Sequence, residues 1–177
     1  DEISTVFPRL ELAHLAVLQG AYHEARAELK TVMSVARASG YDWPLVKAAR
    51  YLGNIATLLG EFPQSRMYLL DSLRLAEELG MIRDQISVLY DLATVEAEAG
   101  DKETAVRLLT LVQEHPLSHH TRTFSMFSGD QEVRFQKLAE MYLQRLREEM
   151  PHEKYSAAAA DGRALELDTA VLEMLNG

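Results

Sequence analysis

The fold is decided by residues 52–65, which read Leu-Gly-Asn-Ile-Ala-Thr-Leu-Leu-Gly-Glu-Phe-Pro-Gln-Ser. The same order of residue classes returns 40 positions earlier and 40 positions later. The positions that keep this register are Gly20, Gly60 and Gly100; Leu12, Leu52 and Leu92; and Ala25, Ser65 and Ala105. A second glycine series, at Gly40 and Gly80, has the same spacing. A fixed period of this length is typical of proteins built from stacked helical repeats.

Each copy of the repeat reads as a pair of helices. Apolar residues recur at spacings near three and four, as at Leu12, Leu15 and Leu18, which is typical of an amphipathic helix. Glycine ends each helix because it adopts a left-handed conformation without steric cost. The pattern therefore predicts three helical hairpins, over about 7–40, 44–80 and 83–114.

Small residues occupy matching positions in the two helices of each hairpin. We expect three facing pairs, which are Ala13 with Ala25, Gly53 with Ser65, and Ala93 with Ala105. Small side chains there allow the two helices to approach closely. A leucine at such a position would overpack the contact and lower the stability of the fold by about 1–3 kcal/mol.

The repeat stops at Pro116, and the tail follows a different pattern. Residues 116–130 are rich in His, Ser and Thr and predict a loop or a short helix. An amphipathic helix is predicted over 131–149, followed by short helices at 153–161, ending at Gly162, and at 169–175. We expect this helix to cap the last repeat.

The whole pattern predicts an all-α protein, a right-handed α-α superhelix of three hairpins. The predicted organisation is a repeat region over 1–115, a connection over 116–130, and a capping helix with a helical tail over 131–177.

Composition restricts the function classes. The 177 residues include 18 basic and 27 acidic residues, for a net charge of −9, so direct binding to nucleic acid or to anionic lipid is not expected. The chain has no Cys, which excludes disulfides and thiolate catalysis. It has no apolar run long enough to span a membrane, and its start does not resemble a signal peptide. We therefore expect a cytoplasmic location without membrane contact.

The sequence contains no recognised catalytic or metal-binding motif. The sequence has no Walker-type glycine loop, no Gly-x-Ser-x-Gly and no His-Glu-x-x-His, so we predict neither an enzyme nor a cofactor. His115, His119 and His120 lie within six residues, but no cysteine or suitably spaced carboxylate completes a metal site. We interpret these histidines as part of a polar loop. Trp43, between copies one and two, is expected to pack between repeats.

The repeats resemble the tetratricopeptide (TPR) family. Leu52-Gly53-Asn54 is similar to the Leu-Gly-Asn of its consensus, and Gly60-Glu61-Phe62 with Ser65 is similar to its Gly-Asp-Tyr…Ala. Gly100-Asp101 with Ala105 fits the same positions. The period of 40 exceeds the ~34 of the common TPR. It resembles the longer repeats of bacterial regulators of the MalT type and of kinesin light chains.

The tail resembles the end of bacterial signalling ATPases of the STAND class. The resemblance rests on Tyr155-Ser156-Ala157-Ala158-Ala159, Gly162-Arg163-Ala164-Leu165 and Leu167-Asp168-Thr169-Ala170-Val171. In that class a nucleotide-binding domain and an effector domain precede a TPR-like sensor. The resemblance implies that this segment is a C-terminal sensor, that upstream domains of the same chain are partners, and that the ATP site lies outside it.

The TPR resemblance implies a binding surface on the concave face, which the first helix of each pair forms. The repeat register gives these candidates: His14 with Phe7, Leu10 and Val17; Lys47, Arg50, Asn54 and Thr57; and Tyr90 and Thr94 with Ser87 and Ala97. Lys47, Arg50 and Asn54 share one helical stripe and could hold a carboxylate or a phosphate. The stripe resembles part of the carboxylate clamp of chaperone-binding TPRs, but Ser87 and Asp91 stand where that clamp has basic residues.

Alternatives stay open for both the surface and the function. The polar stripe is otherwise explained as a solvated helix face that serves solubility. For the function, the first hypothesis is a sensor that recognises a protein, a peptide or a small effector. The second is a scaffold that assembles complexes or forms a homodimer through Phe7, Leu10 and Val17 at the start of copy one.

Overall fold

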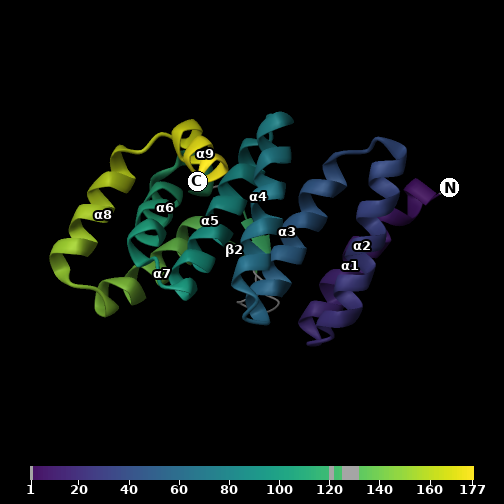
Figure 1. Cartoon of the computed structure of the whole chain (residues 1–177), viewed down its shortest axis with the longest axis horizontal. Helices are drawn as coiled ribbons and strands as arrows, with labels where there is room; N and C mark the ends of the chain where they lie inside the picture. The colour runs from purple at the N-terminus through teal and green to yellow at the C-terminus, as the bar shows by residue number, and fades with distance from the viewer. Residues whose placement is uncertain (1, 120–121, 125–131) are drawn as a thin grey trace. The chain divides into compact units, whose positions relative to one another are not determined.

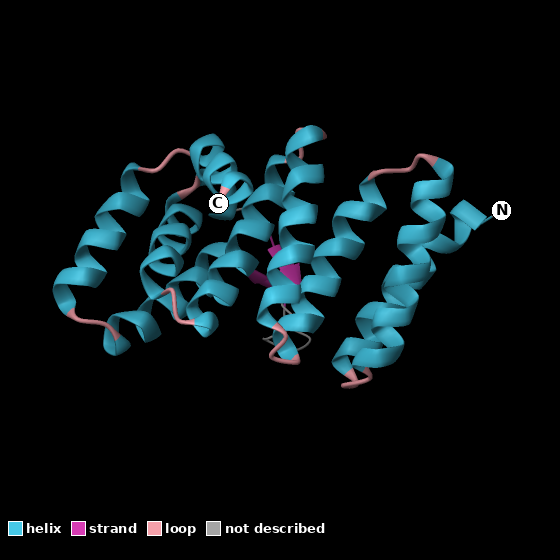
Figure 2. Ribbon diagram, viewed as in Figure 1, coloured by secondary structure: helices cyan, strands magenta, loops and turns pink. Residues whose placement is uncertain are grey.

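The computed structural model describes residues 2–119, 122–124 and 132–177. Contacts within the chain divide it into two compact units, Asp1–Leu79 and Gly80–Gly177. Helices dominate the described residues, which confirms the predicted all-α class (Figure 2). The division falls between the second and third hairpins, so the third hairpin groups with the tail. The right-handed superhelix stays a prediction.

The first unit consists of two helical hairpins (Figure 1). After a 3-10 turn, η1 (Glu2–Thr5), its helices are α1 (Val6–Leu18), α2 (Tyr22–Ser39), α3 (Trp43–Leu58) and α4 (Phe62–Glu78). The pairs α1 with α2 and α3 with α4 pack against each other, and α2 also packs against α3. The repeat pattern is confirmed here as two hairpins in series.

The glycines of both series end helices as predicted. Gly20 and Gly60 have φ of 74° and 73°, and Gly40, after α2, has φ of 65°. These values lie in the left-handed region that favours glycine. After Gly20 and Gly60, the next backbone N–H bonds back into the helix, from Ala21 to the Ala16 carbonyl and from Glu61 to the Ala56 carbonyl, both at 2.8 Å. The glycine spacing therefore sets where the chain reverses.

The facing small residues hold the second hairpin together. A Cβ on Gly53 would lie 2.6 Å from Leu69 Cγ and 3.3 Å from the Ser65 carbonyl oxygen, so α3 and α4 cross closely at this glycine. The hydroxyls of Thr57 and Ser65 are 2.7 Å apart and share a hydrogen bond across the same crossing. The prediction that Gly53 faces Ser65 is confirmed.

The second unit combines the third hairpin with the tail. Its helices are α5 (Ile82–Ala99), α6 (Lys102–Glu114), α7 (Phe135–Glu149), α8 (His152–Ala164) and α9 (Leu167–Asn176), with a 3-10 turn, η2 (Pro116–His119). Helices α7 and α8 both pack on α6, and α7 also contacts α5. The shared core includes Leu109, Phe135 and Leu146, which are all at most 1% exposed.

Two short strands correct the prediction for the connection. Strands β1 (Arg122–Phe124) and β2 (Glu132–Arg134) pair antiparallel, with Thr123 opposite Val133. Accordingly α7 begins at Phe135 rather than at residue 131. β-branched and aromatic residues favour strands, but strands of three residues are too short to show an alternating pattern. The rest of the predicted loop, residues 120–121 and 125–131, lies outside the described residues.

Gly162 corrects the prediction for the tail, because it lies inside α8 and does not end it. Its backbone is not among those with positive φ, and the residue is buried. A Cβ there would lie 2.8 Å from Thr110 Cβ and closer still to the Arg107 carbonyl oxygen of α6. The glycine thus serves a close helix crossing.

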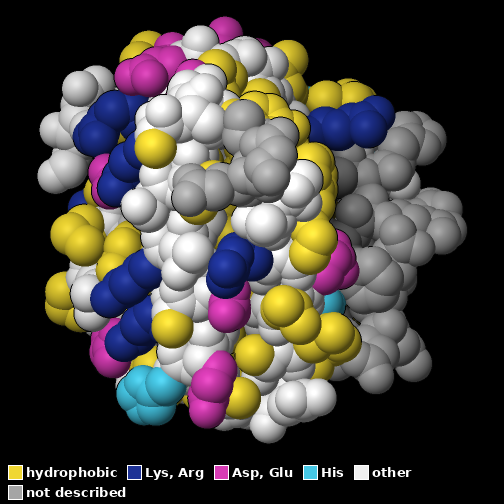
Figure 3. Space-filling view, turned by 90° about the vertical axis from the view of Figure 1, so that its right-hand side faces the viewer, with side chains coloured by type: hydrophobic (Ala, Val, Ile, Leu, Met, Phe, Trp, Pro, Cys, Tyr) yellow, Lys and Arg dark blue, Asp and Glu magenta, His cyan; other side chains and the backbone are white. Residues whose placement is uncertain are grey.

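The outer face of α1 differs from its equivalents in the other repeats. Leu12 and Leu15 are 54% and 51% exposed, whereas Leu52 and Ile55, at the same register in α3, are fully buried. Leu12 keeps the repeat register but lies outside the core, since no described helix covers this face of α1 in the way that α2 covers α3. At this end of the molecule, Figure 3 shows apolar side chains among charged ones.

Among the described helices, none combines the length with the hydropathy that crossing a bilayer requires.

Candidate functional site

A cluster of two aromatic rings and a lysine lies on α1 and α3 of the first unit. The rings of Phe7 and Trp43 are stacked, with their centroids 5.3 Å apart and their planes at 30°. Lys47 lies one turn after Trp43 on α3, and its Nζ is 5.8 Å from the centroid of the Trp43 ring. We call Phe7, Trp43 and Lys47 the aromatic–lysine cluster. It brings together two helices of neighbouring hairpins.

The cluster offers apolar area and positive charge at one place. Phe7 is 51% exposed, while Trp43 and Lys47 are half-buried, and Lys47, like Arg50, has a further interaction partner within the protein. Large rigid rings contribute contact area at low conformational cost, and a cation beside them favours acidic ligands. The cluster therefore suits a peptide with an apolar and an acidic side chain. The spacing of Trp43 and Lys47 was visible in the sequence, but the contribution of Phe7 depends on how α1 packs.

The remaining candidates of the α3 stripe are mostly inside the structure. Arg50 and Asn54 are only 6% and 4% exposed, and Arg50 is not a free cation. Thr57 donates a hydrogen bond to the Gly53 carbonyl at 3.1 Å and bonds to Ser65, so its hydroxyl serves the α3–α4 packing. Of the three residues predicted to form an anion-binding stripe, Lys47 belongs to the aromatic–lysine cluster, whereas Arg50 and Asn54 do not.

The candidates on α1 divide between surface and core. His14 is half-buried and has an interaction partner. Leu10 and Val17, predicted for the concave face and for a homodimer surface, are 6% and 5% exposed and belong to the core. That prediction is wrong because these two residues lie with Val6 and Ala13 on the buried face of α1.

The candidates on α5 are buried as well. Tyr90 and Thr94 are 2% and 1% exposed, and the predicted neighbours Ser87 and Ala97 are 4% exposed. The Tyr90 ring meets Phe135 and Tyr142 of α7 edge-on, at centroid distances of 5.6 and 6.3 Å. Thr94 donates its hydroxyl proton to the Asp91 carbonyl at 2.7 Å. Because α7 packs over this part of α5, these side chains are not open to a ligand.

Ion pairs connect α7 to both helices of the third hairpin, α5 and α6. Arg145 pairs with Glu98 of α5 at 2.8 Å and with Glu149 at 3.2 Å, and Glu149 pairs with Lys102 of α6 at 2.9 Å. The Arg145 guanidinium lies 4.9 Å from the centroid of the Tyr142 ring, and the Tyr142 hydroxyl is 3.5 Å from Glu98. Burial, and then the nearby charge of Glu98, raise the pKa of Tyr142.

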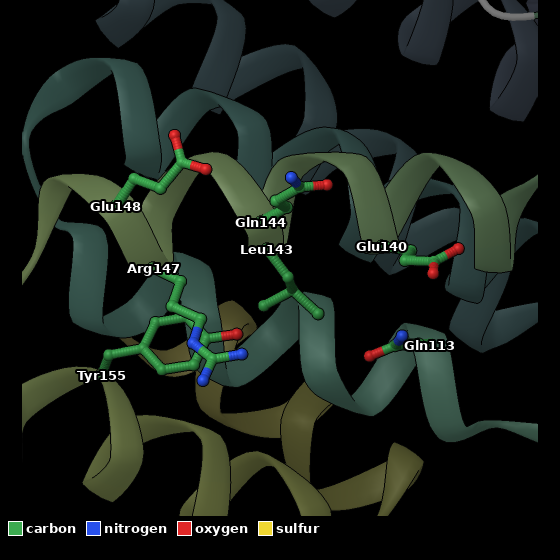
Figure 4. Close-up of a pocket in the computed structure, with 7 residues that line it drawn as sticks. All are labelled: Gln113, Glu140, Leu143, Gln144, Arg147, Glu148 and Tyr155. Atoms are coloured by element: carbon green, nitrogen blue, oxygen red, sulfur yellow. The ribbon is translucent and has the colours of Figure 1, made fainter. Parts of the chain in front are cut away.

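A groove between α7 and α8 has no counterpart in the sequence predictions. It has a volume of about 610 Å³ and is lined from α6, α7 and α8 (Figure 4). The side chains that line it are Gln113, Glu140, Leu143, Gln144, Arg147, Glu148 and Tyr155. No repeat relates these residues, so no pattern in the sequence could have joined them.

The histidines of the connection show no metal geometry in the described part of the chain, where no group of three potential ligands occurs. His120 lies outside the described residues. His115 accepts a hydrogen bond at Nδ1 from the Leu117 backbone N–H, at 3.2 Å. Burial lowers the pKa of His115, which favours the neutral ring that this bond requires.

No protein-family model matches the chain, and no curated protein matches its sequence.

Proposed function

We propose that the chain is a non-catalytic, TPR-like recognition module that binds a protein or a peptide at the aromatic–lysine cluster. The observation that carries this proposal is the exposed Phe7 ring stacked on Trp43, with Lys47 above the same indole. A stacked pair on two helices is pre-organised, so little side-chain entropy is lost on binding. An open helix face also suits an extended ligand better than a small one.

The module also has a proposed setting within a larger protein. The resemblance of residues 155–171 to the tails of STAND-class proteins supports a C-terminal sensor of a cytoplasmic bacterial signalling ATPase or transcriptional regulator. In that setting the ligand biases the state of upstream domains in the same chain.

A thermal-shift screen against peptides, nucleotides and small metabolites tests the binding function. A ligand that binds only the folded state stabilises it by about 2.7 kcal/mol at 100 times its dissociation constant. The matched variant is Lys47→Glu, because Lys47 is only half-buried, whereas a glutamate at the buried Arg50 would disturb the fold. Peptide hits that disappear in Lys47→Glu support the proposal. Hits that survive in the variant place the binding site elsewhere and contradict it.

A scaffold function is the second candidate, and the exposed face of α1 favours it. Leu12 and Leu15 are 54% and 51% exposed, and an exposed apolar face of this kind is typical of an interaction surface. In an antiparallel, two-fold pair of α1 helices, Leu12 of one copy would meet Leu15 of the other. This arrangement would bury four leucines without opposing two like charges at its centre.

Sedimentation equilibrium tests the homodimer. Leu12→Glu and Leu15→Arg should each be monomeric alone, because each buries a charge without a partner. Mixed together, they should form a heterodimer through the new Glu–Arg pair. Wild-type chain that stays monomeric at high concentration contradicts the scaffold.

A further inference from the structure

We infer that the groove between α7 and α8 is a second binding site, which takes a short peptide by its carboxylate. The groove forms because α7 and α8 both pack against α6 but make few contacts with each other. Gly162 lets α8 approach α6 closely. The volume of about 610 Å³ lies within the range of ligand sites, which is roughly 300–1,000 Å³, and exceeds what a lone inorganic anion needs.

One end of the groove is cationic. Arg147 and Tyr155 lie there in Figure 4, while Glu148 points to the other side of α7. Within the described residues, Arg147 has no hydrogen-bond or ion-pair partner. Nearby cations of the same unit are paired, for example Arg145 with Glu98 and Lys154 with Glu103. The guanidinium of Arg147 is therefore available to a ligand.

The other end is polar and acidic. Gln113 and Glu140 lie there, and Leu143, which is 5% exposed, lies between the two ends (Figure 4). The amide of Gln113 both donates and accepts, which matches a peptide group, and Glu140 accepts from an N–H. Glu140 already pairs with Lys137 at 3.0 Å, so its charge is partly offset.

This order of groups identifies the ligand class. A guanidinium binds a carboxylate through two parallel hydrogen bonds, and the hydroxyl of Tyr155 can donate a third. From that anchor, a peptide runs past Leu143 and reaches Gln113 and Glu140 with its backbone. The groove offers one guanidinium at its cationic end and Glu140 at the other end, which suits a singly charged carboxylate better than a phosphate. The site is independent of the aromatic–lysine cluster.

The experiment uses the full chain and three defined probes. They are acetyl-Ala-Leu-Ala-Ala with a free C-terminal carboxylate, the same peptide as its amide, and acetyl-Ala-Leu-Ala-Asp as its amide. Binding is followed by NMR, from the side-chain Nε–H of Arg147 and the side-chain amide of Gln113. We expect the free acid or the aspartate probe to shift both signals, and the uncharged amide to shift neither. Binding of the free acid identifies a C-terminal carboxylate as the anchor. Binding of the aspartate probe identifies an acidic side chain as the anchor.

Variants separate the groove from other cations. Arg147→Gln should weaken the binding by about tenfold or more, because charge-assisted hydrogen bonds are lost. Arg147→Lys, which keeps the charge without the fork, should be intermediate. Arg163→Gln, at an exposed arginine of α8 outside the groove, and Lys47→Glu, in the cluster, should leave the affinity unchanged. Equal affinity of wild type and Arg147→Gln overturns the inference, as does the absence of binding by both charged probes up to about 10 mM.

Discussion

Two glycines inside helices set how closely neighbouring helices cross. Gly53 and Gly162 have ordinary helical φ, so neither is needed for a turn. Each would place a Cβ under 3 Å from atoms of the facing helix, at Leu69 for Gly53 and at Thr110 for Gly162. Alanine is the better helix former by roughly 1 kcal/mol, so helix propensity alone would favour alanine at both positions. Packing decides at both positions.

Gly162→Ala should therefore destabilise the second unit. The facing atoms include the Arg107 carbonyl of the α6 backbone, which cannot turn aside as a side chain would. We expect a loss of about 1–3 kcal/mol in the free energy of unfolding, measured by urea denaturation.

The control for this change is Ala160→Gly, at an exposed position of the same helix. It should cost about 1 kcal/mol through propensity alone. A Gly162→Ala variant as stable as wild type would show that α6 and α8 are not held at this distance.

His115 gives the end of α6 a dependence on pH. Burial lowers its pKa from the usual value, which is about 6.5, so the unfolded chain takes up a proton first as the pH falls. The stabilising contribution is present above pH ~6.5 and is lost as the pH falls through the lower folded pKa. Protonation also removes the acceptor for the Leu117 N–H.

His115→Asn should remove this part of the pH dependence, since its carbonyl oxygen can accept the same hydrogen bond at any pH. Thermal unfolding of both proteins between about pH 7 and 5 measures the difference. If the melting temperatures of wild type and variant fell in parallel as the pH is lowered, His115 would not be the source of this pH dependence.

At the scale of the element, the repeat helices were predictable and the tail was only partly so. Gly20, Gly40 and Gly60 mark helix ends by a local conformational rule, so the hairpins around them follow from the sequence. The crossing at Gly162 depends on where α6 lies, and the β1–β2 pairing joins segments that show no local pattern. Such long-range contacts cannot be derived from spacing alone.

Helix α7 is held to the third hairpin by contacts that change with pH at the alkaline end. Burial and then Glu98 raise the pKa of Tyr142, so the folded state keeps the phenol proton more firmly than the unfolded chain. The stability from this group is complete below the unfolded pKa of about 10 and is lost as the pH rises through the folded value.

Tyr142→Phe should abolish that loss while it keeps the ring contacts with Tyr90 and Arg145. The free energies of unfolding of wild type and variant are compared between about pH 9 and 11, so that the other tyrosines cancel. A variant that loses stability as steeply as wild type would mean that another group controls α7.

At the scale of the whole molecule, part of the candidate site was predictable. Lys47 was found from the repeat register, because the register fixes which face of α3 it occupies. Tyr90 and Thr94 follow the same register and yet are buried, since the tail covers α5 where a plain repeat would leave it open. The groove at Arg147 required the packing of three helices, which no register describes.

The fluorescence emission of Trp43, the sole tryptophan, reports directly on binding at the aromatic–lysine cluster. Peptides are selected from a random library on wild-type chain, and each is titrated while the fluorescence is recorded. We expect the selected peptides to contain acidic and apolar residues and to shift the Trp43 emission on binding. They should bind Phe7→Ala and Lys47→Glu at least about tenfold more weakly than wild type. Selected peptides that leave the emission unchanged and bind both variants as tightly as wild type would contradict binding at the cluster.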